Sequence, residues 1–173
     1  MLQHPNIKIH LNTDFFTIRE LIPADCQIIY SGPIDRFFNY RFGRLEWRSL
    51  SFEKKMLDIP DFQGIAVMNY AEAGVPYTRI HEFKHLTPEQ AVSPHQTLIC
   101  MEYPKNYTTG DEPYYPINTT DNQKIYQQYA AASRQLPHVI FGGRLGSYSY
   151  LDMDRAIESA LMIYQTKIRG VQK

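Results

Sequence analysis

Three short apolar runs lie near the N-terminus with no helical pattern between them, at residues 7–11, 15–18 and 25–30. Continuous apolar runs are typical of strands that are buried on both faces, as in parallel sheets. Parallel neighbours need a crossover connection, usually a helix, and residues 7–30 offer none. Two arrangements therefore remain open: strands of a sheet whose other members lie elsewhere, or an irregular meander.

The middle of the chain predicts antiparallel sheet. Residues 45–52 alternate apolar and polar side chains, and further strands are expected at residues 62–70, 77–85 and 97–103. Each run is bounded by Gly, Pro or Asn, which interrupt regular structure. The spacing of three arginines indicates that some of them share one strand face, and a solvated face is the simpler interpretation: Arg41, Arg44 and Arg48.

Two helices are expected in the C-terminal half. The first covers residues 121–135 behind the N-cap candidate Thr119, and a short strand follows at residues 138–141. The second begins near Asp152, which is most simply its N-cap, carries one apolar stripe and stops near Gly170. The predicted fold class is therefore α+β, a mainly antiparallel mixed β-sheet with two helices in the C-terminal half, and the length predicts one domain over residues 1–173.

Composition argues against several classes of protein. The formal net charge is +0, which disfavours a nucleic-acid-binding protein. No apolar run is long enough to cross a membrane, and the first residues lack the apolar region of a signal peptide, so the cytoplasm is expected. Cys26 and Cys100 form no metal pattern and are expected to be buried thiols. His81 and His85 are expected on one strand, so no metal site is predicted.

Arginine and tyrosine supply the candidate binding groups. Arg79 lies in VPYTRI and Arg144 lies in FGGRLGSYSYLDMD, each with tyrosines close by. The guanidinium offers a rigid fork of donors that matches phosphate. The pairs Tyr114–Tyr115 and Tyr148–Tyr150 could line a polar cleft, because tyrosine joins an apolar body to a polar tip. The alternative is that these rings lie on half-exposed sheet faces.

The Gly142-Gly143-Arg144 segment follows a predicted strand and precedes a predicted helix. Glycines allow the backbone to approach a ligand, and a helix N-terminus attracts anions. A tight turn with a surface arginine explains the segment equally well. Because the chain shows no glycine-rich phosphate loop, metal cluster or nucleophile elbow, the predicted site would work with a group that lies elsewhere.

Four ordered segments resemble the C-terminal half of bacterial UDP-galactopyranose mutase: IIYSGPIDRFFNYRFGRLEWRSL, FQGIAVMNYAEAGVPYTRIHEFKH, DEPYYPI and VIFGGRLGSYSYLDMDRAIESAL. The resemblance is colinear from about residue 5 to residue 168. It implies a flavoenzyme that interconverts UDP-galactopyranose and UDP-galactofuranose for cell-surface glycans. In that family the reduced flavin attacks the anomeric carbon through N5 as UDP leaves, and the sugar opens through an iminium and recloses as the furanose.

The resemblance also implies roles for individual residues. Arg79 and Arg144 are expected to contact the diphosphate from opposite walls as catalytic residues. The expected substrate-binding residues are Tyr115, Tyr150 and Asn69. The expected flavin-side residues are Gly32, Pro33, Arg48, Gly143, Asp152 and Met153.

The family's dinucleotide-binding βαβ unit, with its GxGxxG turn, and its helical lid domain have no counterpart in these 173 residues. The resemblance therefore implies that residues 40–116 form the substrate-side sheet, while residues 5–34 and 137–169 complete the flavin domain. A truncated or split mutase is expected, which is inactive alone and does not hold FAD tightly. The alternatives are a non-catalytic module that binds UDP-sugar or another protein, and a decayed fragment. A separate FAD-binding half and a homo-oligomer are the expected partners.

Overall fold

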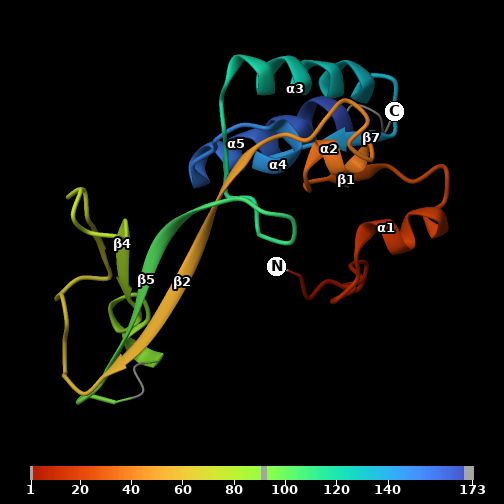
Figure 1. Cartoon of the computed structure of the whole chain (residues 1–173). Helices are drawn as coiled ribbons and strands as arrows, with labels where there is room; N and C mark the ends of the chain where they lie inside the picture. Colours follow the sequence, from red (N-terminus) through yellow and green to blue (C-terminus); the bar gives the residue numbers. More distant parts are fainter. Residues whose placement is uncertain (1, 91–92, 170–173) are drawn as a thin grey trace.

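A computed structural model describes residues 2–90 and 93–169, and it contains two β-sheets of different kinds (Figure 1). The larger sheet has five antiparallel strands in the order β3-β4-β5-β2-β6, and the smaller pairs β1 with β7 in parallel. The helices gather around the small sheet, while β2 and β5 extend away from them to the far end of the large sheet (Figure 1). The predicted α+β class is confirmed.

The large sheet is built on one long strand pair. Its strands are β2 (Trp47–Leu57), β3 (Val67–Asn69), β4 (Arg79–Glu82), β5 (Thr97–Asn106) and β6 (Tyr115–Pro116). Strands β2 and β5 pair from Arg48 opposite Asn106 to Leu57 opposite Thr97. One face of the sheet carries an apolar cluster centred on Ile80, Ile99 and Met101. The opposite face is more open, since Phe52 in the middle of β2 is 46 % exposed.

The predictions for the two strands around residue 70 were only partly right. Only residues 67–69 of the expected strand 62–70 form β3, because the Phe62 and Gln63 amides donate to the Glu82 carboxylate at 3.0 and 2.9 Å instead of joining a ladder. The expected strand 77–85 ends at Glu82 and continues as the 3₁₀ turn η2 (Phe83–His85). His85 therefore does not lie on a strand, and a second 3₁₀ turn, η3 (Pro88–Gln90), follows it.

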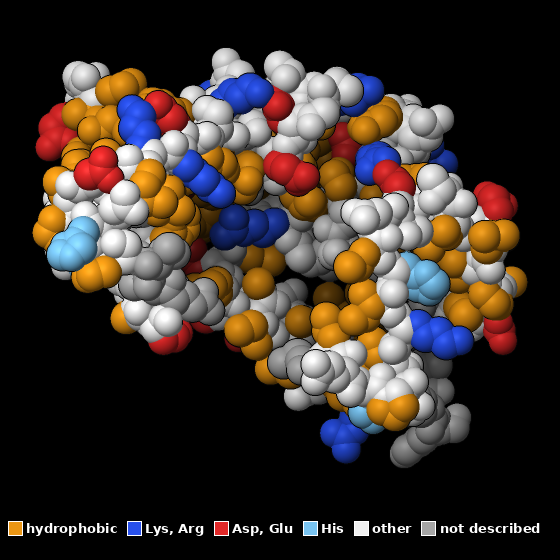
Figure 2. Space-filling view, turned by 90° about the horizontal axis from the view of Figure 1, so that it is seen from below, with side chains coloured by type: hydrophobic (Ala, Val, Ile, Leu, Met, Phe, Trp, Pro, Cys, Tyr) orange, Lys and Arg blue, Asp and Glu red, His pale blue; other side chains and the backbone are white. Residues whose placement is uncertain are grey.

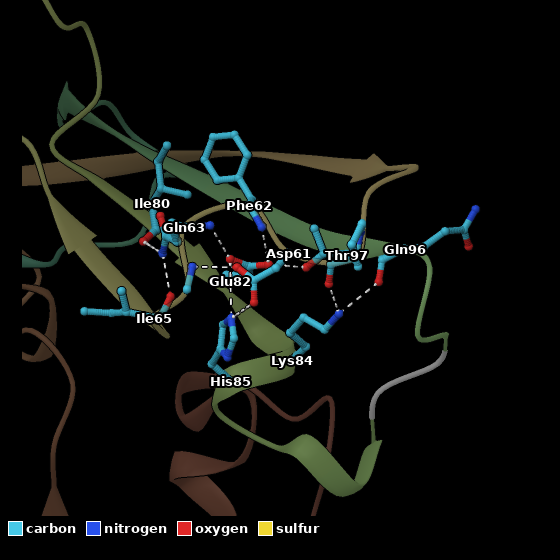
Figure 3. A network of polar contacts seen from close by, with 12 residues as sticks. Asp61, Phe62, Gln63, Ile65, Ile80, Glu82, Lys84, His85, Gln96 and Thr97 are labelled. Atoms are coloured by element: carbon cyan, nitrogen blue, oxygen red, sulfur yellow. Dashed lines mark hydrogen bonds and ion pairs between the residues drawn. The ribbon is translucent and has the colours of Figure 1, made fainter.

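A polar network centred on Glu82 fixes this part of the sheet (Figure 3). Glu82 is fully buried and also accepts a hydrogen bond from Thr97 Oγ1 at 2.6 Å. Burial acts to raise the pKa of Glu82, but the donors from Thr97 and from the amides of residues 62 and 63 outweigh it and lower that pKa. Lys84 Nζ donates to the carbonyls of Pro60 and Gln96. The network thus anchors β4, on which Arg79 lies.

Asp61, Glu82 and His85 bring three potential metal-ligand atoms within 4.8 Å of one another. His85 Nε2 lies 2.9 Å from Asp61 Oδ2 and 3.6 Å from Glu82 Oε2. The Glu82 oxygens already accept three hydrogen bonds from protein groups. Because ion pairing and hydrogen bonding explain this group, we give it a structural role.

The N-terminal segment differs from the prediction. Residues 7–11 are exposed and form no strand with any described residue, so the expected strand is wrong. Residues 15–18 form the helix α1 (Phe15–Ile18) rather than a strand, because the Asp14 side chain caps the amide of Phe16 at 2.9 Å. A 3₁₀ turn, η1 (Arg19–Leu21), continues the helix. Cys26 in the segment that follows is exposed, so the expectation of a buried thiol is wrong there, whereas Cys100 is buried.

The small sheet joins distant parts of the chain. Strands β1 (Ile28–Tyr30) and β7 (Val139–Phe141) align Tyr30 with Phe141. The helices that surround them are α2 (Ile34–Phe37), α3 (Thr120–Ser133), α4 (Gly143–Ser147) and α5 (Met153–Ile163), the last continued by a π-helical turn, η4 (Tyr164–Ile168). The predicted Thr119 cap of α3 is confirmed, since its side chain accepts from Asn122 N. The predicted stop at Gly170 lies outside the described residues.

Arg41 and Arg44 precede β2, so the prediction that they share a strand face with Arg48 is wrong. Asn39 and Tyr40 both adopt left-handed backbone conformations, with φ of 53° and 56°, and the chain turns there. The guanidinium carbon of Arg44 lies 3.9 Å from the centre of the Tyr40 ring. The turn lies before the expected strand 45–52, which begins two residues late, at Trp47.

The apolar stripe of α5 faces outward. Met153, Ile157 and Leu161 are 85, 62 and 57 % exposed.

Seen from below, the molecule is hollowed between the end of the large sheet and the helical part, with apolar and basic side chains along the hollow (Figure 2). None of the described helices combines the length and apolar character needed to cross a bilayer.

Candidate functional site

Arg144 packs against two tyrosines that come from different segments. Its guanidinium carbon lies 4.6 Å from the centre of the Tyr150 ring and 5.7 Å from that of Tyr115, and the two rings are 5.7 Å apart. Arg144 Nε donates to the Leu151 carbonyl at 2.6 Å. No hydrogen bond to the described residues uses its two terminal nitrogens, so these donors can serve a ligand. The structure thus brings Arg144, Tyr115 and Tyr150 together.

Asp152 lies beside this cluster. A hydrogen bond to Asp152, and then the charge of Asp152, raises the pKa of Tyr150 above its ordinary value. Asp152 occupies the N-cap position of α5, but its side chain makes no capping hydrogen bond. The expected capping role is therefore wrong for the side chain. Met153 follows as the first residue of α5.

Arg79 is held by neighbours on the large sheet. Its Nε donates to Asn69 Oδ1 at 2.8 Å, and these two residues are direct partners across β3 and β4. Arg79 Nη1 lies 3.7 Å from Glu102 Oε2, and His81 Nε2 lies 3.4 Å from the same oxygen. Glu102 is 7 % exposed, so a shielded carboxylate offsets part of the Arg79 charge.

Glu102 was not identified from the sequence. It lies directly opposite Arg79 in β5, and both strands were predicted. The exact pairing of two strands cannot be derived from their separate patterns, because a slip of one residue changes every partner. Glu102 could have been found only by fixing that register.

The Arg79 group and Tyr115 lie on one face of the large sheet. Directly opposed residues share a face, and alternate residues along a strand do so too. Tyr115 is opposite Arg48, Phe52 lies on the same side of β2 as Arg48, and Glu102 is opposite both Phe52 and Arg79. Successive ring contacts of 6.2 and 6.3 Å connect Phe52, Tyr114 and Tyr115. Polar and aromatic groups therefore run continuously from β3 to α4.

Arg48 belongs to this face. Its Nη1 donates to Asn106 Oδ1 at 2.6 Å, and its direct partner in β6 is Tyr115. The expected flavin-side assignment grouped Arg48 with the glycines that follow β1. The structure places it on the large sheet beside the tyrosines.

Glycines gather at the carboxyl ends of β1 and β7. Gly142 N donates to Tyr30 O at 3.1 Å, which continues the pairing past the strands. Gly143 has a φ of +70°, and a Cβ there would lie 3.7 Å from Ser31 Cβ, so the turns after the two strands adjoin. Gly32 and Pro33 continue the turn after β1. Ligands of open parallel sheets bind outside this edge, where glycine permits close approach.

The helix that begins at Gly143, α4, is only five residues long, and Gly142 is its N-cap. So short a helix has a weak dipole, and the predicted anion site at its N-terminus has little support. Any anion contact here depends on the Arg144 guanidinium instead.

A cleft of about 450 Å³ opens next to the glycine edge, and its lining includes Pro33, Asp35, Arg44 and Leu145. Burial raises the pKa of Asp35, although amide donors from Leu45 and Arg36 act against that rise. Leu45 N donates to Asp35 Oδ2 at 2.9 Å. Asp35 therefore ties α2 to the start of β2 and shapes this cleft.

Comparison with known proteins agrees with the resemblance seen in the sequence. The family model for UDP-galactopyranose mutase matches residues 1–150. A dTDP-fucopyranose mutase of Escherichia coli is 36 % identical over 98 % of this chain and 46 % of its own length. A probable UDP-galactopyranose mutase of Klebsiella pneumoniae is 40 % identical over 91 % of this chain and 40 % of its own length.

A UDP-galactopyranose mutase of Mycoplasma pneumoniae is 37 % identical over 93 % of this chain and 43 % of its own length. The chain thus spans less than half the length of these curated relatives. The family match covers most of the chain and includes every segment of the candidate site up to Tyr150. This chain belongs to the UDP-galactopyranose mutase family.

Proposed function

We propose that this chain forms the substrate-side wall of a mutase that isomerises UDP-galactopyranose to UDP-galactofuranose with a flavin, and that it is inactive without an FAD-binding half. The observation that carries the proposal is that the Arg144 guanidinium packs on Tyr115 and Tyr150, while no hydrogen bond to a described residue uses its two terminal nitrogens. A planar guanidinium with adjoining hydroxyls suits a diphosphate.

The two arginines have different roles in this proposal. Arg144 offsets the charge that builds on the diphosphate as the anomeric bond breaks. Tyr115 donates to a phosphate oxygen without adding charge, and Tyr150 does the same once its single hydroxyl proton turns from Asp152 to the ligand. Arg79 approaches the diphosphate from the sheet, where Asn69 fixes its orientation and Glu102 reduces its effective charge.

The residues at the glycine edge fit one side of a flavin site. The ring system would lie against the turns at Gly32, Pro33 and Gly143, and Asp152 and Met153 at the start of α5 would complete the wall. When bound, FAD supplies the nucleophile that acts at the anomeric carbon. Tight binding of the cofactor's pyrophosphate needs a glycine-rich turn that these 173 residues do not contain. Arg48 fits the substrate side better, because it lies beside Tyr115.

The partners follow from the same proposal. An FAD-binding half, on a separate chain or on the same one, supplies the pyrophosphate site and the remaining parallel strands. The exposed apolar stripe of α5 favours association, and the chain alone covers it by forming a homo-oligomer in the cytoplasm.

Calorimetry with UDP-galactose tests the substrate wall. We expect weak saturable binding that Arg144→Ala removes, whereas Arg155→Ala, on the exposed surface of α5, leaves it intact. The absence of heat at millimolar ligand would count against the proposal. We also expect a colourless preparation without mutase activity, and stoichiometric flavin with turnover would overturn the claim that the chain is inactive alone.

A dTDP-fucopyranose mutase is the second candidate, because the relative of that name aligns with 98 % of this chain. Competition between UDP-galactose and dTDP-fucose distinguishes the two substrates. A non-catalytic UDP-sugar-binding or protein-interaction module is the remaining alternative. Sugar binding without turnover after addition of a functional FAD-binding half would favour the binding module.

A further inference from the structure

Tyr148 connects the Arg144 segment to the large sheet. Its hydroxyl lies 2.8 Å from the Glu46 carbonyl and 2.9 Å from the Ile117 carbonyl, the positions just before β2 and just after β6. Its ring packs edge-on against Trp47 at 4.9 Å and is 3 % exposed. The sequence suggested that Tyr148 could line a polar cleft. Tyr148 lies in the core instead.

The backbone of Tyr148 is left-handed, with φ 45° and ψ 47°, at the C-cap of α4. A bulky side chain disfavours this conformation, which costs about 1–2 kcal/mol. Glycine is the usual residue at such a position. The tyrosine is retained in a strained conformation where its ring and hydroxyl are both engaged, which points to a positioning role.

The same two segments touch again two residues further along. Tyr148 contacts Ile117, and Tyr150 packs on Tyr115 at 5.7 Å, so each contact is displaced by two residues along each segment. The Ser149 amide between them donates to Arg144 O at 3.2 Å. Burial raises the pKa of Tyr148 to about 12, so its hydroxyl remains a proton donor at neutral pH.

We propose that Tyr148 is a positioning residue, whose hydrogen bond to the large sheet sets where Arg144 and Tyr150 stand relative to Tyr115. Tyr148 does not touch the ligand itself. The effect of Tyr148 on diphosphate binding rests on the proposed function. Its effect on the geometry of residues 149–151 does not depend on that function.

Tyr148→Phe tests the inference because it removes the hydroxyl and retains the ring. Tyr129→Phe is a matched control, since Tyr129 is fully buried in the same core cluster and its hydroxyl donates to Gly43 O at 2.7 Å. Two quantities are measured in each variant: amide hydrogen exchange at Ser149, and the Kd for UDP. Thermal melting confirms that both variants fold and shows how much stability each has lost.

We expect Tyr148→Phe to accelerate exchange at Ser149 and to raise the Kd for UDP by up to about five-fold, the limit set by the one hydrogen bond that holds the segment in place. Tyr129→Phe should lower the melting temperature comparably and leave both quantities unchanged. Wild-type values in Tyr148→Phe, or equal changes in both variants, would overturn the inference. If exchange at Ser149 is faster in Tyr148→Phe and not in Tyr129→Phe, the positioning role is supported even when the wild-type protein does not bind UDP. The two proposals can therefore fail independently of each other.

Discussion

The guanidinium of Arg144 stacks on the ring of Tyr150 at 4.6 Å while its Nε is tied to the backbone next to that ring. Stacking on the ring fixes the orientation of the guanidinium plane. The N–H donors of its two terminal nitrogens therefore point in fixed directions. A primary amine has neither the plane nor the fork of donors. We therefore expect that a lysine cannot replace Arg144, although it carries the same charge.

Arg144→Lys should consequently lose most of the affinity for UDP. The loss of charge-assisted hydrogen bonds predicts about 1.5–3 kcal/mol, or roughly a ten- to hundred-fold rise in Kd. Calorimetry measures this change, and Arg155→Lys serves as the control on the exposed surface of α5. Equal affinities for the lysine variant and the wild type would show that charge alone matters.

Gly32→Ala should destabilise the chain. A Cβ at residue 32 would come within 2.6 Å of the Tyr30 hydroxyl, and the Tyr30 ring is confined by Phe37 and Phe141. Overpacking of this kind costs about 1–3 kcal/mol, which urea unfolding can measure. Gly74→Ala is the control, because a Cβ there meets no atom within 4 Å. A neutral Gly32→Ala variant would mean that the Tyr30 ring can move aside.

The turn at residues 105–111 should lose stability in acid. The Lys105 side chain, and then Thr108, lower the pKa of Asp111 from 3.8 to about 2. A carboxyl whose pKa is lowered in the folded state adds stability above the unfolded value, and this contribution disappears as the pH falls through the folded value. The stability difference between wild type and Asp111→Asn should therefore be full at neutral pH and vanish near pH 2.

Melting temperatures across that range measure the difference. Asp121→Asn is a useful control, since the Asp121 side chain is 87 % exposed and its ion pair with Lys124 is weak. An Asp111→Asn difference that does not change with pH would mean that the carboxylate charge is not the source of the stability.

The stripe on α5 should drive self-association of the isolated chain. Replacing Ile157 and Leu161, which are 62 and 57 % exposed, by Glu places charge in the middle of the stripe. We expect light scattering to shift from an oligomer to a monomer, with little change in melting temperature because neither side chain is buried. A wild-type chain that is already monomeric would contradict this prediction.

Much of the fold could be predicted where local pattern and environment agree. The alternating run 45–52 covers the first half of β2, and α3 begins at the expected Thr119 cap. The pattern failed where tertiary partners decide the structure. Residues 62–66 are apolar enough for a strand, but buried Glu82 takes the backbone donors of residues 62 and 63. Residues 7–11 have a strand pattern without a described partner.

The candidate site was predictable in its residue types but not in its contacts. The arginine and tyrosine motifs identified Arg144, Tyr115 and Tyr150, which the structure groups together. Neither Glu102 nor Tyr148 could be found in the same way. The position of Glu102 depends on strand register, and the role of Tyr148 depends on two carbonyl groups far away in the chain. Long-range pairing is the information that local patterns lack.

The parallel pairing of residues 28–30 with residues 139–141 sets an order for folding during synthesis. All five strands of the antiparallel sheet have left the ribosome once residue 116 has emerged. The first strand of the parallel pair, by contrast, must wait for more than a hundred further residues to be translated. Its apolar side chains stay available to chaperones throughout that interval, since nascent chains fold in the order in which their partners appear.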